Sequence, residues 1–383
     1  MSLLDNEAFS SCIRCGLCLS VCPTYRVTLN EVDSPRGRTA LVRAQQQGRL
    51  ARGENYADKF FRCLLCASCE NICPSGVELS GILQDARCDV AENELLPEQL
   101  AQLDRAIVAR RNISGEDNAG RVVWADNLAQ PPSGLGKTRA KIVYFVGCVG
   151  SFFPRSYGVP RAFVEILEKA NVDYALLGGQ EWCCGYPIYI DGELNLAQEL
   201  IRHNIDQVQR LGADQVVFTC PSCYHVWQHV YPEALGASLD VELLHATELL
   251  ERLIDQGKIE LGRFPRTVTY HDPCDLGRKS NVYDAPRNIL GKIPGLTLVE
   301  MTENRENAHC CGGGGNLESH NSDLSKKVAR RRVQQASATG AQVIASACQQ
   351  CERTLGNAAR AAKIRMRVMD IGEIVLEALE AAK

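Results

Sequence analysis

Short apolar runs alternate with longer amphipathic segments from residue 141 to the end of the chain. The run KIVYFVGC ends at Cys148, and the run RTVTYHDPC ends at Cys274. Helical spacing of apolar residues, with short β-rich runs between, predicts alternating helices and strands. After the first run, helices are predicted near 159–170 and 194–211, and strands at 174–177 and 215–219. This alternation predicts parallel α/β layers with right-handed crossovers.

The same pattern occurs twice along the chain. A single cysteine, an adjacent cysteine pair and a closing C-x2-C recur about 127 residues later. A repeat of this kind indicates a duplicated structural unit. The first copy contains Cys148, Cys183, Cys184, Cys220 and Cys223, and the second contains Cys274, Cys310, Cys311, Cys348 and Cys351.

Four of these cysteines lie at or just past the end of a predicted strand: Cys148, Cys220, Cys274 and Cys348. In open parallel sheets, ligands collect at that carboxyl edge. The N-termini of the following helices favour thiolate over thiol. We therefore expect each set of five sulfurs to gather at such an edge.

The N-terminal segment carries a different cysteine pattern. Residues 12–23 form CIRCGLCLSVCP and residues 63–74 form CLLCASCENICP, both C-x2-C-x2-C-x3-C-P. This spacing is typical of bacterial two-cluster ferredoxins, in which the fourth cysteine binds the other cluster. It predicts one cubane [4Fe–4S] cluster on Cys12, Cys15, Cys18 and Cys73 and another on Cys63, Cys66, Cys69 and Cys22. Structural zinc, the alternative, needs two cysteine pairs rather than a triplet with a crossed fourth ligand.

The expected architecture is an α-helical two-cluster ferredoxin domain followed by duplicated α/β domains with parallel sheets. The predicted divisions are a ferredoxin domain in 1–95, a helical linker segment in 96–140, and repeated domains in 141–262 and 263–383. Within the first division, Ser34 and Pro35 predict the start of a helix. Arg36, Arg38 and Arg43 in that helix are predicted to lie on a solvated face, and docking of a partner or tuning of a cluster is the alternative.

Composition and charge limit the class of protein and the kind of chemistry that we expect. The chain has 383 residues, a formal charge of −4 and 19 cysteines. The charge disfavours nucleic-acid binding, and we find neither a membrane-spanning apolar run nor a secretory signal. We therefore expect a cytoplasmic protein that could dock on a membrane partner. So many cysteines in a reducing compartment indicate metal or redox chemistry.

Five sulfurs per repeat exceed the four that a cubane cluster or tetrahedral zinc uses. A disulfide between adjacent cysteines would be strained. The pairs Cys183–Cys184 and Cys310–Cys311 make sense if one thiolate bridges irons while its neighbour binds a single iron. This predicts a more open cluster than a cube. A zinc-rich interaction scaffold is the minor alternative, because its ligand counts would differ.

The spacings C-x34-CCG-x34-C-x2-C and C-x35-CCG-x35-C-x2-C resemble the CCG domains of heterodisulfide reductase catalytic subunits. The N-terminal part, with CPTYRVTLNEVDSPRGR, is similar to iron–sulfur subunits of glycolate oxidase and anaerobic glycerol-3-phosphate dehydrogenase. The resemblance covers essentially the whole chain. It implies a noncubane [4Fe–4S] cluster on each set of five cysteines, related by a pseudo-twofold axis, with a disulfide cleaved between them.

The resemblance leaves two functions open. The first is a thiol/disulfide reductase subunit that receives electrons from a flavoprotein or membrane partner. The second is the electron-transfer subunit of a flavin-dependent dehydrogenase for glycolate, lactate or glycerol 3-phosphate, feeding quinone. Two intact five-cysteine motifs favour the first.

Several residues near the motifs have a functional and a structural interpretation. His271 and His309 could donate a proton to a leaving thiolate, or they could orient neighbouring ligands through hydrogen bonds. The run HCCGGGGN lacks the spacing of a phosphate or dinucleotide motif, so we expect no flavin or nicotinamide site. It predicts a close approach of backbone to a cluster or substrate. The basic cluster from Lys326 to Arg332 is predicted to form a solvated helix face.

Overall fold

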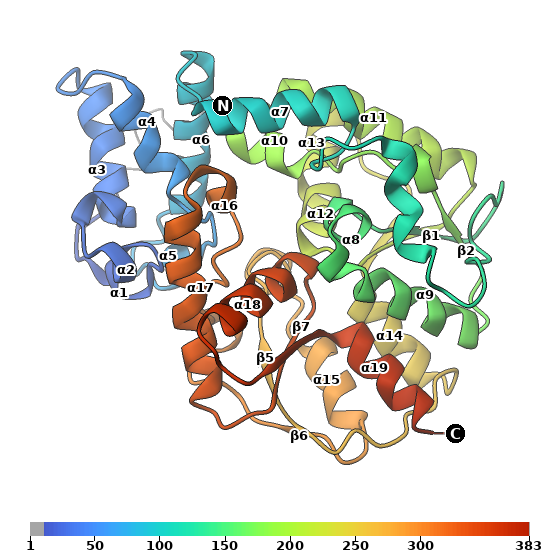
Figure 1. Cartoon of the computed structure of the whole chain (residues 1–383). Helices are drawn as coiled ribbons and strands as arrows, with labels where there is room; N and C mark the ends of the chain where they lie inside the picture. The colour runs from blue at the N-terminus through green and yellow to red at the C-terminus, as the bar shows by residue number, and fades with distance from the viewer. Residues whose placement is uncertain (1–10, 383) are drawn as a thin grey trace.

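The computed structural model describes residues 11–382. Its N-terminal part is helical (Figure 1). The helices are α1 (Leu17–Val21), α2 (Tyr25–Thr28), α3 (Pro35–Gln46), α4 (Glu54–Phe61), α5 (Ser68–Asn71), α6 (Leu79–Glu92) and α7 (Glu98–Arg110). The predicted helix start at Pro35 is confirmed, since Ser34 Oγ accepts a 2.9 Å hydrogen bond from Gly37 N.

The remainder contains two four-stranded parallel sheets with the same strand order. The first, β2-β1-β3-β4, consists of β1 (Ile142–Phe145), β2 (Tyr174–Leu176), β3 (Gln215–Phe218) and β4 (Glu242–His245). The second, β6-β5-β7-β8, consists of β5 (Thr267–His271), β6 (Thr297–Leu298), β7 (Val343–Ser346) and β8 (Arg367–Asp370). The predicted duplicated α/β architecture is confirmed.

Helices connect and cover these strands (Figure 1). In the first half they are α8 (Cys148–Phe152), α9 (Gly158–Lys169), α10 (Tyr186–Asp191), α11 (Leu194–Arg210), α12 (Pro221–His225), α13 (Tyr231–Leu235) and α14 (Ala246–Asp255). In the second half they are α15 (Asp284–Lys292), α16 (Leu317–His320), α17 (Ser322–Ser337), α18 (Gln349–Ala361) and α19 (Ile371–Glu380). Among the described residues, no helix combines the length and apolarity that a bilayer crossing needs.

Burial on both faces explains the apolar strand sequences. All four residues of β1 are buried, and those of β7 are too, as expected for parallel strands between helices. The strands β4 and β8 were not predicted. Both are short edge strands whose first residue is exposed, so they lack the continuous apolar pattern that marks the inner strands.

A buried glutamine joins the two halves. Gln349, at the start of α18, donates to Val146 O at 2.9 Å and to Thr219 Oγ1 at 2.6 Å, and it accepts from Gly150 N at 2.8 Å. A second link runs from the first half to the second, since Ser222 Oγ donates to Asp275 Oδ2 at 2.6 Å. The two links hold the carboxyl edges of the sheets against each other.

A buried arginine joins the N-terminal part to both halves. Arg87 in α6 is 0% exposed. Its guanidinium donates to the carbonyls of Phe60 and Cys63, of Ile190 in the first half, and of Gly315 in the second. No carboxylate lies within ion-pair distance among the described residues. Four carbonyl dipoles therefore solvate this charge.

The glycine run approaches the backbone of the N-terminal part, while its approach to a cluster or substrate stays a prediction. Gly315 has φ +61°, and a Cβ built there would lie 2.5 Å from Cys63 O. A Cβ on Gly314 would lie 3.2 Å from Leu64 O. The run therefore allows its backbone to approach the cysteine-bearing segment of the N-terminal part closely.

Two predictions of solvated basic faces are wrong in part. Arg38 is buried, and its Nε donates to Lys59 O at 2.6 Å. Arg332 is also buried and points into the second half. In both helices the neighbouring elements cover one basic position, which a charge pattern along a single helix cannot reveal.

Replacement of Arg87 should loosen all three parts at once. Arg87→Met would leave four buried carbonyls without their donor, at about 1–3 kcal/mol for each unsatisfied group. We expect a large fall in the urea midpoint of the anaerobic protein. Arg52→Met is the matched control, because Arg52 pairs with Asp89 at the surface, and such pairs contribute about 0.2–1 kcal/mol. Equal shifts in both variants would contradict the assignment.

Candidate metal centres

The eight N-terminal cysteines fall into two groups around separate small cavities. One cavity, of about 390 Å³, is lined by Cys12, Cys15, Cys18 and Cys73. The other, of about 370 Å³, is lined by Cys22, Cys63, Cys66 and Cys69. This is the crossed grouping that the spacing predicts, with each fourth cysteine contributed by the other motif.

Left-handed backbone shapes both loops. Arg14 and Gly16 in the first motif have positive φ, as do Leu65 and Ala67 at the matching positions of the second. Three of these residues are not glycine, so the conformation carries strain that the surroundings must hold. The turns direct amides toward sulfur. The N–H of Leu65 donates to Cys63 Sγ at 3.4 Å.

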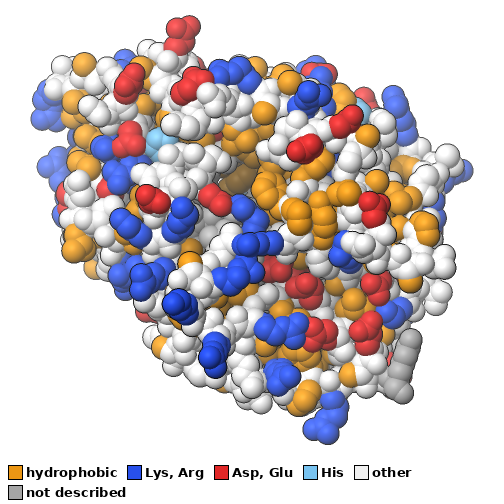
Figure 2. Space-filling view, in the orientation of Figure 1, with side chains coloured by type: hydrophobic (Ala, Val, Ile, Leu, Met, Phe, Trp, Pro, Cys, Tyr) orange, Lys and Arg blue, Asp and Glu red, His pale blue; other side chains and the backbone are white. Residues whose placement is uncertain are grey.

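Nine of the ten remaining motif cysteines line one central cavity with an empty volume of about 830 Å³. Its sulfurs come from both halves: Cys148, Cys183, Cys184, Cys220, Cys223, Cys274, Cys311, Cys348 and Cys351. Cys310 is buried beside the cavity and contacts Cys66, Cys274 and Cys311. The face in Figure 2 is hollowed near its centre, with hydrophobic side chains gathered beside the hollow.

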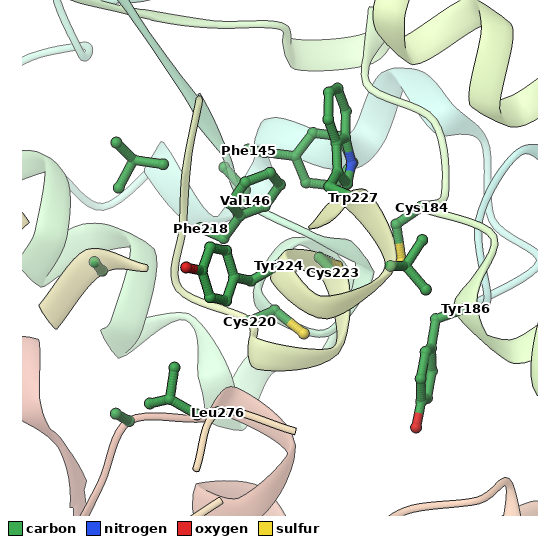
Figure 3. Close-up of a cluster of buried hydrophobic side chains, with 14 of the residues drawn as sticks. Phe145, Val146, Cys184, Tyr186, Phe218, Cys220, Cys223, Tyr224, Trp227 and Leu276 are labelled. Atoms are coloured by element: carbon green, nitrogen blue, oxygen red, sulfur yellow. The ribbon is translucent and has the colours of Figure 1, made fainter. Parts of the chain in front are cut away.

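The strand ends position these sulfurs as predicted from the sequence. Cys148 begins α8, three residues past the end of β1, while Cys220 and Cys348 are the residues before α12 and α18. Behind the first set, Phe145, Phe218 and Trp227 pack into an aromatic wall (Figure 3). This wall is apolar, so that side of the sulfurs is shielded from water.

The second set contains a direct contact between two sulfurs. Cys351 Sγ and Cys311 Sγ lie 3.3 Å apart. Backbone amides donate to three of its sulfurs: Gly312 N to Cys310, Gly313 N to Cys311 and Cys351 N to Cys348. Amides that point at sulfur stabilise negative charge on a thiolate.

The expectation that helix termini lower thiol pKa values is wrong at two positions. A hydrogen bond with Cys183 and burial raise the pKa of Cys148 well above its usual value. The hydrogen bond with Cys351 lowers the pKa of Cys348, but burial together with the nearby Cys220 and Cys311 raises it to about 11. The pKa of Cys220 is lowered, chiefly by Cys223. Burial and sulfur–sulfur contacts therefore dominate over the short helices.

A buried arginine that the sequence did not indicate lies beside the first set. Arg121 Nη2 donates to Cys148 Sγ at 3.3 Å, and Nη1 pairs with Glu181 Oε1 at 2.8 Å. Glu181 also accepts from the amides of Val146 and Gly147. Arg121 lies in the linker, where no cysteine motif indicates a site. The one signal in the sequence was that Glu181 comes two residues before Cys183.

His271 is fully buried against the second set. Its Nδ1 accepts a 3.0 Å hydrogen bond from Arg332 Nε. The neutral ring therefore carries its proton on Nε2, and the ring interacts with Cys311. Ligand atoms of His271, Cys311 and Cys351 lie within 4.8 Å of one another.

His309 lies between the side chains of Arg26 and Gln335. Its ring nitrogens lie 2.9 Å from Arg26 Nη1 and 2.7 Å from Gln335 Nε2. Burial, with the charges of Arg26 and Arg332, lowers its pKa to about 4. Neither His309 nor His271 is among the residues that line the central cavity. Proton donation by either histidine to a leaving thiolate stays a prediction.

The donor set fits iron–sulfur clusters. The N-terminal cavities each offer four sulfurs, and the central cavity has roughly twice the volume of either. Soft thiolates are the ligands that cluster iron prefers. Desolvation raises the pKa of many of these thiols, Cys69 and Cys148 among them, so a bound cation is needed to keep them ionised in such a site.

Comparisons with known proteins agree with this arrangement. The 4Fe-4S dicluster domain family matches residues 8–77, and the cysteine-rich domain family matches residues 142–227 and 268–356. One subunit of the dihydromethanophenazine:CoB--CoM heterodisulfide reductase of Methanosarcina barkeri is 32% identical over 99% of this chain and 95% of its own.

Other relatives share part of their length with this chain. The probable iron-sulfur-binding oxidoreductase FadF of Bacillus subtilis is 30% identical over 84% of this chain and 47% of its own. The EtfAB:quinone oxidoreductase of Syntrophomonas wolfei is 27% identical over 99% of this chain and 59% of its own. The chain thus belongs to the family of this heterodisulfide reductase subunit, a family of oxidoreductase subunits in which a 4Fe-4S dicluster domain precedes two cysteine-rich domains.

Proposed function

We propose that this chain is the iron–sulfur subunit of a complex that reduces a disulfide or a similar acceptor in the central cavity. The observation that carries the proposal is the convergence of sulfurs from both repeats on one cavity of about 830 Å³. A substrate there would lie between the two five-cysteine sets. The apolar wall behind the first set excludes water from that side.

The proposed ligands are those predicted from the sequence. The two N-terminal groups of four would each hold a cubane [4Fe–4S] cluster, and each five-cysteine set would hold a noncubane one. When bound, these clusters supply one-electron steps that divide the two-electron reduction of a disulfide. The protein holds the sulfurs in place and donates backbone hydrogen bonds to them.

The contacts between the sulfur groups support the entry of electrons through the N-terminal part. Cys15 in the first N-terminal group is exposed. Cys66 in the second group forms a hydrogen bond with Cys310, which lowers the pKa of Cys66 to about 6. The N-terminal part thus meets the second five-cysteine set through a direct sulfur contact. An electron-donating partner, a flavoprotein or a membrane subunit, would dock near Cys15.

We propose the domain division expected from the sequence: ferredoxin domain 1–95, linker segment 96–140, and CCG domains 141–262 and 263–383. Both sheets lie within the last two ranges, and each range holds one complete sheet. Arg121 shows that the linker segment also contributes to the first sulfur set.

The second candidate function is electron transfer alone, within a flavin-dependent dehydrogenase that feeds quinone. The similarity to EtfAB:quinone oxidoreductase and to FadF favours it. Anaerobic co-purification from the native host, with partners identified by mass, separates the two. The purified complex is then assayed with a viologen donor and either 2-hydroxyethyl disulfide or a soluble quinone. Reduction of quinone alone would replace the first function with the second.

Iron and sulfide analysis tests the proposed clusters. We expect about 16 irons per chain, four for each cluster. The double variant Cys183→Ala/Cys311→Ala should retain about eight irons, since its N-terminal ligands are intact. EPR of the reduced variant should still show the cubane signals. Eight irons in the unmodified chain, with no signals beyond those of two cubanes, would contradict the noncubane assignment.

Arg121→Met should make the first five-cysteine site harder to reduce. The change removes a positive charge beside Cys148 and leaves Glu181 buried without its partner. We expect the midpoint potential of that site to fall by at least ~60 mV, a tenfold change for one electron. EPR-monitored titration measures it, with the cubane potentials as internal controls. The double variant Arg121→Met/Glu181→Gln should recover part of the shift, and an unchanged potential would refute the role of Arg121.

A further inference from the structure

Disulfide reduction needs protons as well as electrons. The balanced step is RSSR′ + 2 e⁻ + 2 H⁺ → RSH + R′SH, in which one S–S bond breaks and two S–H bonds form. The partner complex supplies the electrons in the proposed function. Asp275 also lines the cavity, but its carboxylate is occupied by an ion pair with Lys279 at 2.8 Å and a 2.6 Å hydrogen bond from Ser222 Oγ.

Two buried aspartates lie behind the other side of the cavity. Asn316 and Pro187 both line the cavity. Asn316 Nδ2 donates to Asp191 Oδ2 at 2.8 Å and to Pro187 O at 3.0 Å. Asp191 ends α10, and Asp104 lies in α7, which contacts both α10 and α16. Figure 1 shows α7 running above α10.

Most carboxyl oxygens of these two aspartates lack a hydrogen-bond partner among the described residues. Asp104 is 2% exposed and Asp191 is 0% exposed. Both oxygens of Asp104 and Oδ1 of Asp191 are buried without a hydrogen-bond partner among the described residues. Two neighbouring carboxylates in such a site do not both stay ionised. At least one therefore carries a proton or binds a water molecule.

Burial and neighbouring charges raise the pKa of both aspartates. Burial, followed by repulsion from Asp191 and Glu193, raises the pKa of Asp104 to about 8. Burial also raises the pKa of Asp191 to about 7, although Arg87 and the hydrogen bond from Asn316 oppose the rise. Glu193 is half-buried, and its charge acts on both aspartates. Both aspartates thus exchange protons near neutral pH.

We propose that Asp104 and Asp191 form a proton relay that carries protons from the surface near Glu193 to the central cavity beside Asn316. Asn316 positions Asp191 and does not itself transfer the proton. The described residues give no hydrogen bond between the two carboxyls, and Asp191 does not line the cavity, so the relay includes water molecules between Asp104 and Asp191 and between Asp191 and the cavity. The relay rests on the proposed disulfide reduction. Protons would enter through this relay from the side of α7. Electrons would enter through the N-terminal part, which meets the second sulfur set at Cys66 and Cys310.

The first test measures protonation in the holoprotein without turnover. Infrared difference spectra between pH 6 and pH 9 should show a protonated carboxyl band that titrates near pH 7 to 8. Asp104→Asn and Asp191→Asn should each remove or shift it. Glu98→Gln is the matched control on α7, where the side chain is exposed and bonded to Gln102 and Arg105. A band that is unchanged in both Asn variants would overturn the relay.

The pH dependence of the urea midpoint provides a second test of the protonation of Asp104. A carboxyl whose folded-state pKa is raised contributes stability below its unfolded pKa, and that contribution is lost as pH rises through the folded value. The unmodified protein should therefore lose stability between about pH 4 and pH 8 relative to Asp104→Asn. The urea midpoints of the two should converge at acid pH. Parallel midpoints over this range would overturn the protonation of Asp104.

Turnover distinguishes the relay from the proposed function. In the complex, disulfide reduction by Asp104→Asn or Asp191→Asn should fall at least tenfold and lose its decline above pH 8. Reduction of the iron–sulfur centres by a chemical donor should proceed at the unmodified rate. Unchanged turnover and pH profile would overturn the relay alone. Absence of disulfide reduction in the unmodified complex would overturn the proposed function, and the relay with it.

Discussion

The sites depend on one constraint: the carboxyl edges of two parallel sheets must face each other. Each repeat places its sulfurs at strand ends, but separate repeats would form two shallow sites open to water. Gln349 fixes the edges together, with three hydrogen bonds from the second half to Val146, Thr219 and Gly150 of the first. A buried amide with all these bonds satisfied specifies one relative placement, and that placement encloses the cavity.

The two repeats share their strand order and sulfur ligands but differ in the charged and polar residues around the sulfurs. His271 in the second half aligns with Phe145 in the first, and His309 aligns with Trp182. The first sulfur set instead receives Arg121 from the linker, with Glu181 as its counter-charge. Two sites with the same ligands and different buried charges will differ in potential. In the proposed function, this asymmetry would make one of the two five-cysteine sites easier to reduce than the other.

Sequence spacing predicted the sulfur groups because ligand positions are local. The crossed role of Cys22 and Cys73 and the strand-end positions of Cys148 and Cys274 follow from motif and period alone. The positions of the charged residues around the sulfurs could not be predicted in this way. Arg38 and Arg332 belong to helices whose charge patterns indicate solvent exposure, and Arg121 lies in a segment without a cysteine motif. Only packing against other segments buries these three side chains. The edge strands β4 and β8 were missed for a related reason, since half-exposed strands carry a weak pattern.

The buried arginine at the junction connects these features. Arg87 binds the carbonyl of Cys63 and that of Gly315, next to Asn316, and its charge opposes the rise that burial causes in the pKa of Asp191. Any shift of the N-terminal part that moves this guanidinium changes both the cysteine-bearing loop and the carboxyl pair. Charge added to a low-dielectric cavity is costly unless it is compensated. The proposed entry of electrons and that of protons would therefore both depend on the segments that Arg87 holds in place. Arg87 holds these segments without contacting the cavity itself.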